Sequence, residues 1–346
     1  MSRRTLKTVA LAGALLSAAS LSACRGSSSG GESDAGSQVQ IMVGGIDKVI
    51  YLPAMLTQQL GYFADNGVDV KLMTEPSGAS AENVLVAGKV QGVVGFYDHS
   101  VTLQAQGKCI ESVVQLAKVP GEAEVVSTDA SGSLSSPSDF AGKKLGVTSP
   151  GSSTDYLTQY LATKNGVDTA DYTTVTAGAG SDFIAAMQHG GIDAGMTTDP
   201  TIATAVSQGV GKVMLDMRTE KGTREALGGL YPAASLYMDC SYVEDNPETV
   251  QKVANAFVET LKWMNTHSAA EIAAKMPTGY DGGNPDLYEQ SIDDTLPSFT
   301  ADGRMPEGGP DTVLNVLGTF SDIVKQQRDS IDLSKTYTTE FVDKAS

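Results

Sequence analysis

Two stretches of this chain share one order of motifs, and this internal repeat constrains the fold more than any other feature of the sequence. The copies cover residues 41–96 and 145–196. Their common motifs are Leu-Thr-Gln-x-Leu at 56–60 and 157–161, and Asn-Gly-Val-Asp at 66–69 and 165–168. In each copy the pattern predicts strand, helix, strand, helix and strand, and Asn-Gly suits the left-handed end of a helix. We therefore expect two similar α/β lobes.

Alternating strands and helices favour mainly parallel sheets with helices on both faces. Further strand-like runs lie outside the repeat copies, at 112–117, 124–126, 212–215 and 234–238. A chain that leaves the first lobe and later returns to it crosses between the lobes twice, which forms a hinge. We expect residues 40–125 and 230–346 to form the first lobe and residues 126–229 to form the second.

The C-terminal third is predicted to be helical. Asn246-Pro247, the capping box at 268–271 and Asn284-Pro285 each mark the start of a helix. We expect these helices to cover the first lobe and to carry no chemistry.

Length, composition and charge exclude several classes of protein. A chain of 346 residues, 41% of them hydrophobic, can bury a core without metal ions or disulfide bonds. Its 24 basic and 41 acidic residues give a net charge of −17. This charge repels phosphate backbones and anionic membrane surfaces, so we expect no nucleic-acid partner.

Residues 1–23 have the pattern of a bacterial lipoprotein signal. Arg3, Arg4 and Lys7 precede an apolar run that is too short to span a membrane. The run ends in Leu-Ser-Ala-Cys at 21–24, which resembles a lipobox, so we expect a lipid on Cys24. An ordinary secretory signal cleaved near a chance cysteine is the alternative. Residues 24–39, rich in Gly and Ser, would then tether the domain to the extracytoplasmic face of the cell membrane.

Signal, tether, two α/β lobes and a double crossing together resemble the solute-binding lipoproteins of bacterial ABC transporters. The stretches 60–70, 86–92 and 139–147 are similar to those of the nitrate, taurine and alkanesulfonate binding proteins and the related thiamine-precursor binders. The similarity covers residues 40–345. It implies the two-lobed type II periplasmic-binding-protein fold, with a small-molecule solute between the lobes and ABC permease subunits as partners. We expect the protein to be a monomer.

Candidate ligand contacts follow from the fold class. In open α/β sheets, ligands lie beyond the carboxyl ends of the strands, near helix N-termini whose N–H groups favour anions. In the first lobe this rule selects Gly45, Asp47, Ser77, Ser80, Tyr97, Asp98 and His99. In the second lobe it selects Ser149, Gly151, Ser152, Ser153, Thr198 and Asp199.

Each candidate also has a purely structural interpretation. The serines suit helix N-caps, Asp98 suits a cap at the helix that it begins, and Asp199 before Pro200 suits an N-cap followed by proline. Aromatic residues could wall the cleft or belong to the core; they are Tyr51, Phe96, Tyr97 and Tyr231. The loop at 149–154 is the strongest candidate, because Gly and hydroxyl residues directly before a helix leave several donors facing the cleft.

The cysteines and histidines give weaker signals. After lipidation, Cys109 and Cys240 remain, and both flank predicted strands, so a disulfide between them and two free thiols are both open. His189 and His267 are expected in solvent near helix ends. No group of His, Cys and acidic residues has metal-ligand spacing, so we expect no metal and no cofactor.

The leading functional hypothesis is a non-catalytic receptor that captures a small anionic or zwitterionic solute, such as a sulfonate or nitrate, for an ABC permease. A binder of a thiamine-precursor pyrimidine or another heterocycle is the alternative, because Asp47 and Asp98 would suit an N–H donor. A pyrimidine-synthase-like enzyme is disfavoured, since such relatives use a Cys-rich motif that does not occur in this sequence. A lipid-anchored sensor or adhesion module stays open as a third role.

The lipobox generates a direct test. The change Cys24→Ala should release the protein or leave an unprocessed precursor, because the thiol that accepts the lipid is gone. Membrane fractionation with N-terminal sequencing measures this. Unchanged membrane retention of a protein with a cleaved N-terminus would contradict the assignment.

Overall fold

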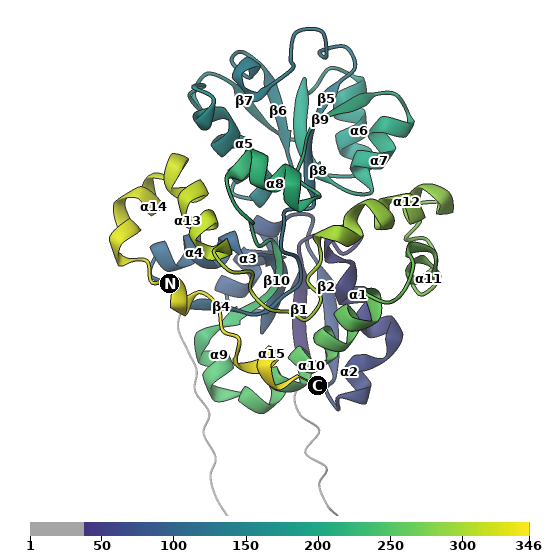
Figure 1. Ribbon diagram of the computed structural model, residues 1–346, viewed down its shortest axis with the longest axis vertical. Coiled ribbons are helices and arrows are strands. Elements are labelled where there is room, and N and C mark those ends of the chain that lie inside the picture. The colour runs from purple at the N-terminus through teal and green to yellow at the C-terminus, as the bar shows by residue number, and fades with distance from the viewer. Residues whose placement is uncertain (1–37, 346) are drawn as a thin grey trace, which may run out of the picture. The chain divides into compact units, whose positions relative to one another are not determined.

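The computed structural model describes residues 38–345 and contains two five-stranded sheets (Figure 1). The first lobe is built on strands in the order β2 (Val70–Thr74), β1 (Val39–Val43), β3 (Gly92–Phe96), β10 (Ala234–Asp239) and β4 (Ile110–Gln115). The second lobe is built on strands in the order β7 (Thr173–Thr176), β6 (Lys144–Val147), β8 (Ala194–Thr198), β5 (Glu122–Ser127) and β9 (Gly211–Asp216). The predicted α/β fold with two mainly parallel sheets is confirmed.

The two repeat copies form the same unit in the two sheets. In each, the first strand lies between the second and the third, with parallel pairing on both sides. The helices of the first copy are α1 (Leu52–Leu60), α2 (Tyr62–Asp65) and α3 (Gly78–Val86), and those of the second are α5 (Ser153–Lys164) and α6 (Ser181–Gln188). Gly67 and Gly166 of the Asn-Gly pairs have φ angles of 66° and 79°, as the predicted left-handed helix ends require.

The chain crosses between the sheets twice. The first crossing follows β4, and the second, which contains α8 (Glu220–Leu227), follows β9 and ends at β10. In each sheet the one strand antiparallel to its neighbours, β5 or β10, is the strand that directly follows a crossing. The expected boundary between residues 125 and 126 falls inside β5, so the first crossing lies at residues 116–121.

The remaining helices complete both lobes. They are α4 (Asp98–Ala105), α7 (Thr201–Ser207), α9 (Cys240–Asp245), α10 (Pro247–Met264), α11 (Ala269–Ala273), α12 (Pro285–Thr295), α13 (Gly309–Phe320), α14 (Asp322–Gln327) and α15 (Glu340–Lys344). The long helix α10 buries Val253, Phe257 and Leu261 in the core of the first lobe. In contrast to our expectation, α13 does not cover the first lobe alone, because its buried face packs on both α4 and α5.

The expected tether and signal lie almost entirely outside the described residues. Cys24 and residues 1–23 belong to this part, whereas Val39, assigned to the tether, is the first residue of β1. Within residues 38–345, no helix is long and apolar enough to cross a membrane.

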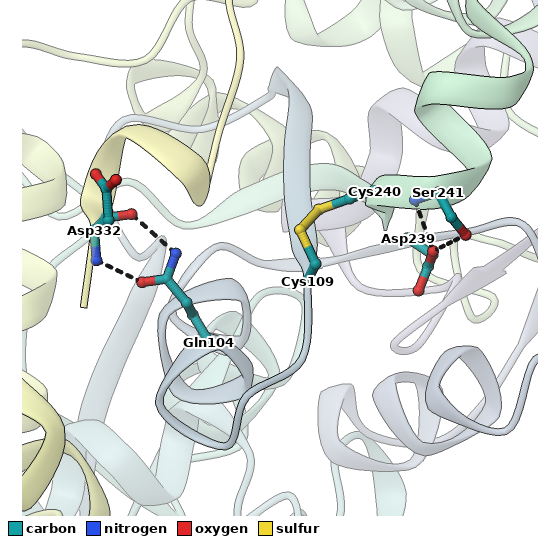
Figure 2. The surroundings of a disulfide bond; sticks show 6 residues. All are labelled: Gln104, Cys109, Asp239, Cys240, Ser241 and Asp332. Atoms are coloured by element: carbon teal, nitrogen blue, oxygen red, sulfur yellow. Dashed lines mark hydrogen bonds between the residues drawn. A yellow bond between two sulfur atoms is a disulfide. The ribbon is translucent and has the colours of Figure 1, made fainter. Parts of the chain in front are cut away.

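A disulfide bond joins Cys109 and Cys240 at the ends of two neighbouring strands (Figure 2). Cys109 precedes β4 and Cys240 follows β10, and the Cys240 N–H donates to the Cys109 carbonyl at 3.1 Å. The sequence separation of 131 residues means that the bond closes a loop containing the whole second sheet. Cross-linking such a loop restricts the unfolded chain more than the folded one.

The disulfide should therefore stabilise the fold. Changing both cysteines, Cys109→Ala with Cys240→Ala, should lower the free energy of unfolding by about 2–5 kcal/mol. Urea unfolding of the variant and of the oxidised wild type measures the difference, and reduced wild type is the control, since it should match the variant. Equal stability of all three forms would show that the bond contributes nothing.

A carboxyl group lies buried inside the second sheet. Glu124 on β5 is opposite Met196 of β8 and Leu215 of β9, and its side chain is fully buried. Both of its carboxyl oxygens lack a hydrogen-bond partner within residues 38–345. Burial raises the pKa of Glu124 to about 8, because the interior disfavours the charged form.

This carboxyl should make stability depend on pH. Because the pKa in the folded state lies above the unfolded value, the folded protein holds this proton over a range where the unfolded chain has lost it. Stability should therefore fall as the pH rises from about 4.5 to 8. Gln does not titrate, so over this pH range the unfolding free energy of Glu124→Gln should fall less than that of wild type, by on the order of 2–4 kcal/mol. Exposed Glu244→Gln is the control, and parallel pH profiles of wild type and Glu124→Gln would contradict the assignment.

Candidate functional site

An enclosed cavity lies where residues of the two lobes meet. Its first-lobe wall consists of Lys48, Tyr51, Gly78 and Phe96, and its second-lobe wall consists of Glu122, Thr148, Ser152, Ser153, Thr154 and Thr198. The space open to the centre of a water molecule is about 10 Å³, enough for roughly one water. We call this space the inner cavity. A larger solute can be held there only if the walls separate.

Lys48 brings a buried positive charge to the inner cavity. It directly precedes the 3-10 turn Val49–Tyr51, and its ammonium donates to the carbonyls of Gly44 at 2.7 Å and Pro76 at 3.2 Å. The turn at Gly45 has a φ of 112°, and a Cβ there would lie 2.6 Å from Lys48 Cε, so only glycine leaves room for this side chain. Burial lowers the pKa of Lys48 to about 8, against the opposing effect of Asp47 and Glu122.

Glu122 supplies a buried carboxyl from the opposite wall. The side chain is 2% exposed, and its Oε2 atom has no hydrogen-bond partner within the described part of the chain. Burial raises the pKa of Glu122 well above its usual range, and Asp98 raises it further while Lys48 lowers it. An unsatisfied buried oxygen is costly, so a ligand that donates a hydrogen bond to it would gain that energy.

Hydroxyl groups line the cavity before α5. Thr148, Ser152 and Thr154 bond to one another at 2.7–2.9 Å. Ser152 Oγ also donates to the Ser149 carbonyl at 2.6 Å. This loop therefore satisfies its own hydroxyls, and Ser152, although it is the N-cap of α5, makes no side-chain capping bond.

Several hydrogen bonds connect the lobes beside the cavity, including one from the Val49 N–H to the Asp199 carbonyl at 2.9 Å. Ser153 Oγ donates to Asp98 Oδ1 at 2.8 Å, and Ser149 Oγ donates to Ser77 Oγ at 2.9 Å. The second Asp98 oxygen accepts from the Tyr231 hydroxyl at 2.8 Å. Burial raises the pKa of Asp98, while His99 and the two hydroxyl donors oppose this rise. The Ser153 bond joins the N-terminal ends of α4 and α5, and the Ser149 bond joins the loop before α5 to the N-cap of α3.

The structure brings together most of the residues predicted to contact ligand. Ser152, Ser153 and Thr198 line the inner cavity, and Asp98, Ser77 and Ser149 form the adjoining contacts between the lobes. Three others shape the loops: Gly45 makes room for Lys48, Gly151 donates its N–H to Asp155 at 2.8 Å, and Ser80 donates its N–H to the N-cap Ser77 at 3.2 Å.

Four predicted residues lie elsewhere. Tyr97 is buried in the core and bonds to Thr336. Asp199 binds Arg218 Nη1 at 2.9 Å. Asp47 is exposed and lines a different groove. His99 is fully buried, with Nδ1 at 3.2 Å from the Tyr237 hydroxyl and Nε2 without a partner among the described residues.

Sequence reasoning missed Lys48, Glu122 and Thr148, and it included Thr154 only as the last residue of the loop at 149–154. A signal existed for the first two. Lys48 is the one basic residue in the loop that follows Gly44-Gly45, and Glu122 and Glu124 alternate with apolar residues in a strand that helices should cover on both faces. Charged residues at such positions are buried, and buried charges mark functional positions more often than exposed ones do.

Comparison with known proteins agrees with this geometry. A family model described as NMT1/THI5 like matches residues 50–270. The protein YtlA of Bacillus subtilis (strain 168) is 22% identical over 249 residues, which are 71% of this chain and 72% of YtlA. A solved protein from Bordetella bronchiseptica RB50 is 33% identical with a TM-score of 0.84, covering 90% of this chain and 97% of its own.

The fold also matches that of a protein with a known ligand. The alkanesulfonate-binding protein SsuA from Xanthomonas axonopodis pv. citri, solved bound to MOPS, has a TM-score of 0.67 at 17% identity, covering 84% of this chain and 93% of SsuA. At this identity the match concerns the fold alone. The family model covers well over half of the residues. The chain therefore belongs to the NMT1/THI5-like family.

Proposed function

We propose that this protein is an extracytoplasmic solute-binding protein that captures a small molecule between its lobes and delivers it to an ABC permease. The observation that carries the proposal is the inner cavity, whose polar groups come from both lobes and include a carboxyl oxygen without a partner in the described residues. A site divided between two lobes that are joined by two crossings is suited to closing around a solute.

The charges of the inner cavity favour a zwitterionic solute. Lys48 and Glu122 face the same space, so an anionic group can pair with Lys48 and an ammonium group with Glu122. Nitrate or a simple sulfonate would leave the Glu122 oxygen unpaired and would meet a buried acidic group. A thiamine-precursor pyrimidine could donate an N–H to Glu122 but would leave Lys48 without an anion. An amino-sulfonate or amino acid satisfies both.

Closure supplies the coupling between binding and transport. The bonds from Ser149 to Ser77 and from Ser153 to Asp98 hold the lobes together around a space that fits roughly one water. A solute must therefore enter while the lobes are apart, and its contacts with both walls then favour closure. A permease that recognises the arrangement of the lobes around a solute would distinguish loaded protein from the arrangement seen here.

The proposed role is non-catalytic. Ser153 donates to Asp98, whereas His99 pairs with Tyr237, so the described residues around the cavity do not place a histidine base on a hydroxyl nucleophile. We place the protein as a monomer at the extracytoplasmic face of the cell membrane, held by the lipid on Cys24. The acidic net charge of the chain disfavours a nucleic-acid partner.

Calorimetry with matched probes tests the ligand class. Taurine and β-alanine should bind the mature protein, whereas ethanesulfonate and propionate, which lack the amine, should bind at least about tenfold more weakly. Glu122→Gln should weaken zwitterion binding roughly 10- to 100-fold, because a charged hydrogen bond is lost. Glu124→Gln is the matched control, since Glu124 lies on the same strand but does not line the cavity.

The ligand class would be excluded if neither zwitterion binds or if the anions bind equally well. The inner cavity would be excluded as the site if Glu122→Gln binds the zwitterions as tightly as wild type does.

A further inference from the structure

A second and larger groove lies between segments of both lobes. Its volume is about 770 Å³, within the range of small-molecule sites. The first lobe contributes Ile46, Asp47, the loop 279–284 and the start of α12, and the second lobe contributes parts of α6 and α7. In Figure 1, α12 lies beside α7, and these two helices pack together. We call this space the outer groove, and it shares no lining residue with the inner cavity.

The outer groove is lined by acidic but no basic side chains. Asp47 and Asp281 lie in its wall, and no Lys, Arg or His does. Within residues 38–345 neither carboxylate forms a salt bridge, and Asp281 Oδ1 accepts only the Gly283 N–H at 3.0 Å. Lys48, next to Asp47 in sequence, points its ammonium at the carbonyls of Gly44 and Pro76 instead. The groove therefore presents two carboxylates without a salt bridge among the described residues, and Lys48 lies close enough to Asp47 for the two charges to interact.

Two tyrosines share the wall with these carboxylates. Tyr280 is half-buried, whereas Tyr288 is only 4% exposed and its hydroxyl makes no hydrogen bond within the described part of the chain. Burial raises the pKa of Tyr288, and Tyr280, Asp281 and Asp47 raise it further. The same carboxylate of Asp47 raises the pKa of Tyr280 after burial. All four groups line the same groove.

We propose that the outer groove binds a small organic cation of the alkylammonium class, with Tyr280 and Tyr288 against its methyl or methylene groups and Asp47 and Asp281 balancing its charge. Aromatic faces attract such cations, and nearby carboxylates strengthen the attraction. A neutral molecule would leave the carboxylates without a counter-charge. This site goes beyond the proposed transport function and does not depend on the inner cavity.

A titration with choline chloride tests the site. Calorimetry on the mature protein compares choline with 3,3-dimethylbutan-1-ol, its neutral isostere, at matched ionic strength. Choline should bind and the isostere should bind at least about fivefold more weakly. Asp281→Asn and Tyr280→Leu should each weaken choline binding about three- to tenfold. Asp286→Asn is the control, because Asp286 is exposed on the first turn of α12 and does not line the groove.

The outcomes separate this site from the transport proposal. Glu122→Gln should bind choline like wild type, because Glu122 lines only the inner cavity. The outer-groove proposal is overturned if choline does not bind or if the neutral isostere binds as tightly as choline. It is also overturned if Asp281→Asn and wild type bind choline with equal affinity. Loss of choline binding in Glu122→Gln with retention in Asp281→Asn would place the cation in the inner cavity and overturn it as well. Melting curves of the variants confirm that they are folded.

Discussion

The architecture depends on two strands, each of which receives the chain after it has crossed from one lobe to the other. β5 enters the second sheet between β8 and β9, and β10 enters the first sheet between β3 and β4. Each is antiparallel to both neighbours, so the ladder hydrogen bonds of each sheet fix the ends of both crossings. The Cys109–Cys240 bond joins the end of β10 to the start of β4, and the covalent loop that it closes contains the whole second sheet. The ladder hydrogen bonds and the disulfide therefore tie both crossings to the sheets that they connect.

Buried charged groups distinguish the region between the lobes from an ordinary core and make it the candidate site. Lys48, Asp98 and Glu122 are each less than a tenth exposed. Lys48 is compensated by two carbonyls and Asp98 by two hydroxyl donors, but one oxygen of Glu122 has no partner in the described residues. In the proposed function a ligand completes this hydrogen bond, whereas the two unpartnered oxygens of Glu124 lie in the same sheet away from the cavity.

The repeat made the fold predictable. The order of Leu-Thr-Gln-x-Leu and Asn-Gly-Val-Asp is the same in both copies and their spacing is nearly so, which indicates a helix end and a following strand in each, so local physics was enough to predict two parallel units. The helix signals at Ser268 and Asn284 were also sufficient, since both side chains cap as predicted. The packing of α13 on α5 could not be predicted, because an amphipathic pattern shows which face is buried and not against which lobe.

The site was less predictable because its contacts join distant residues. The prediction identified the serine loop before α5, but hydroxyls there can cap, bond to one another or cross to the other lobe, and all three choices depend on tertiary neighbours. Asp199 turns to Arg218, 19 residues away, and Tyr97 bonds to Thr336, 239 residues away. Glu122 resembled an ordinary strand residue until pairing with β8 placed it beside Thr198.

The central claim is that a solute lies between Lys48 and Glu122 with contacts from both lobes. A crystal structure of the mature protein grown with taurine tests it most directly. We predict that the amine lies within hydrogen-bond distance of Glu122 and that the sulfonate lies beside Lys48 and the loop at 149–154. Both lobes should then contact the solute. Taurine bound to one lobe alone, or bound elsewhere with the Glu122 oxygen still unpartnered, would contradict the account.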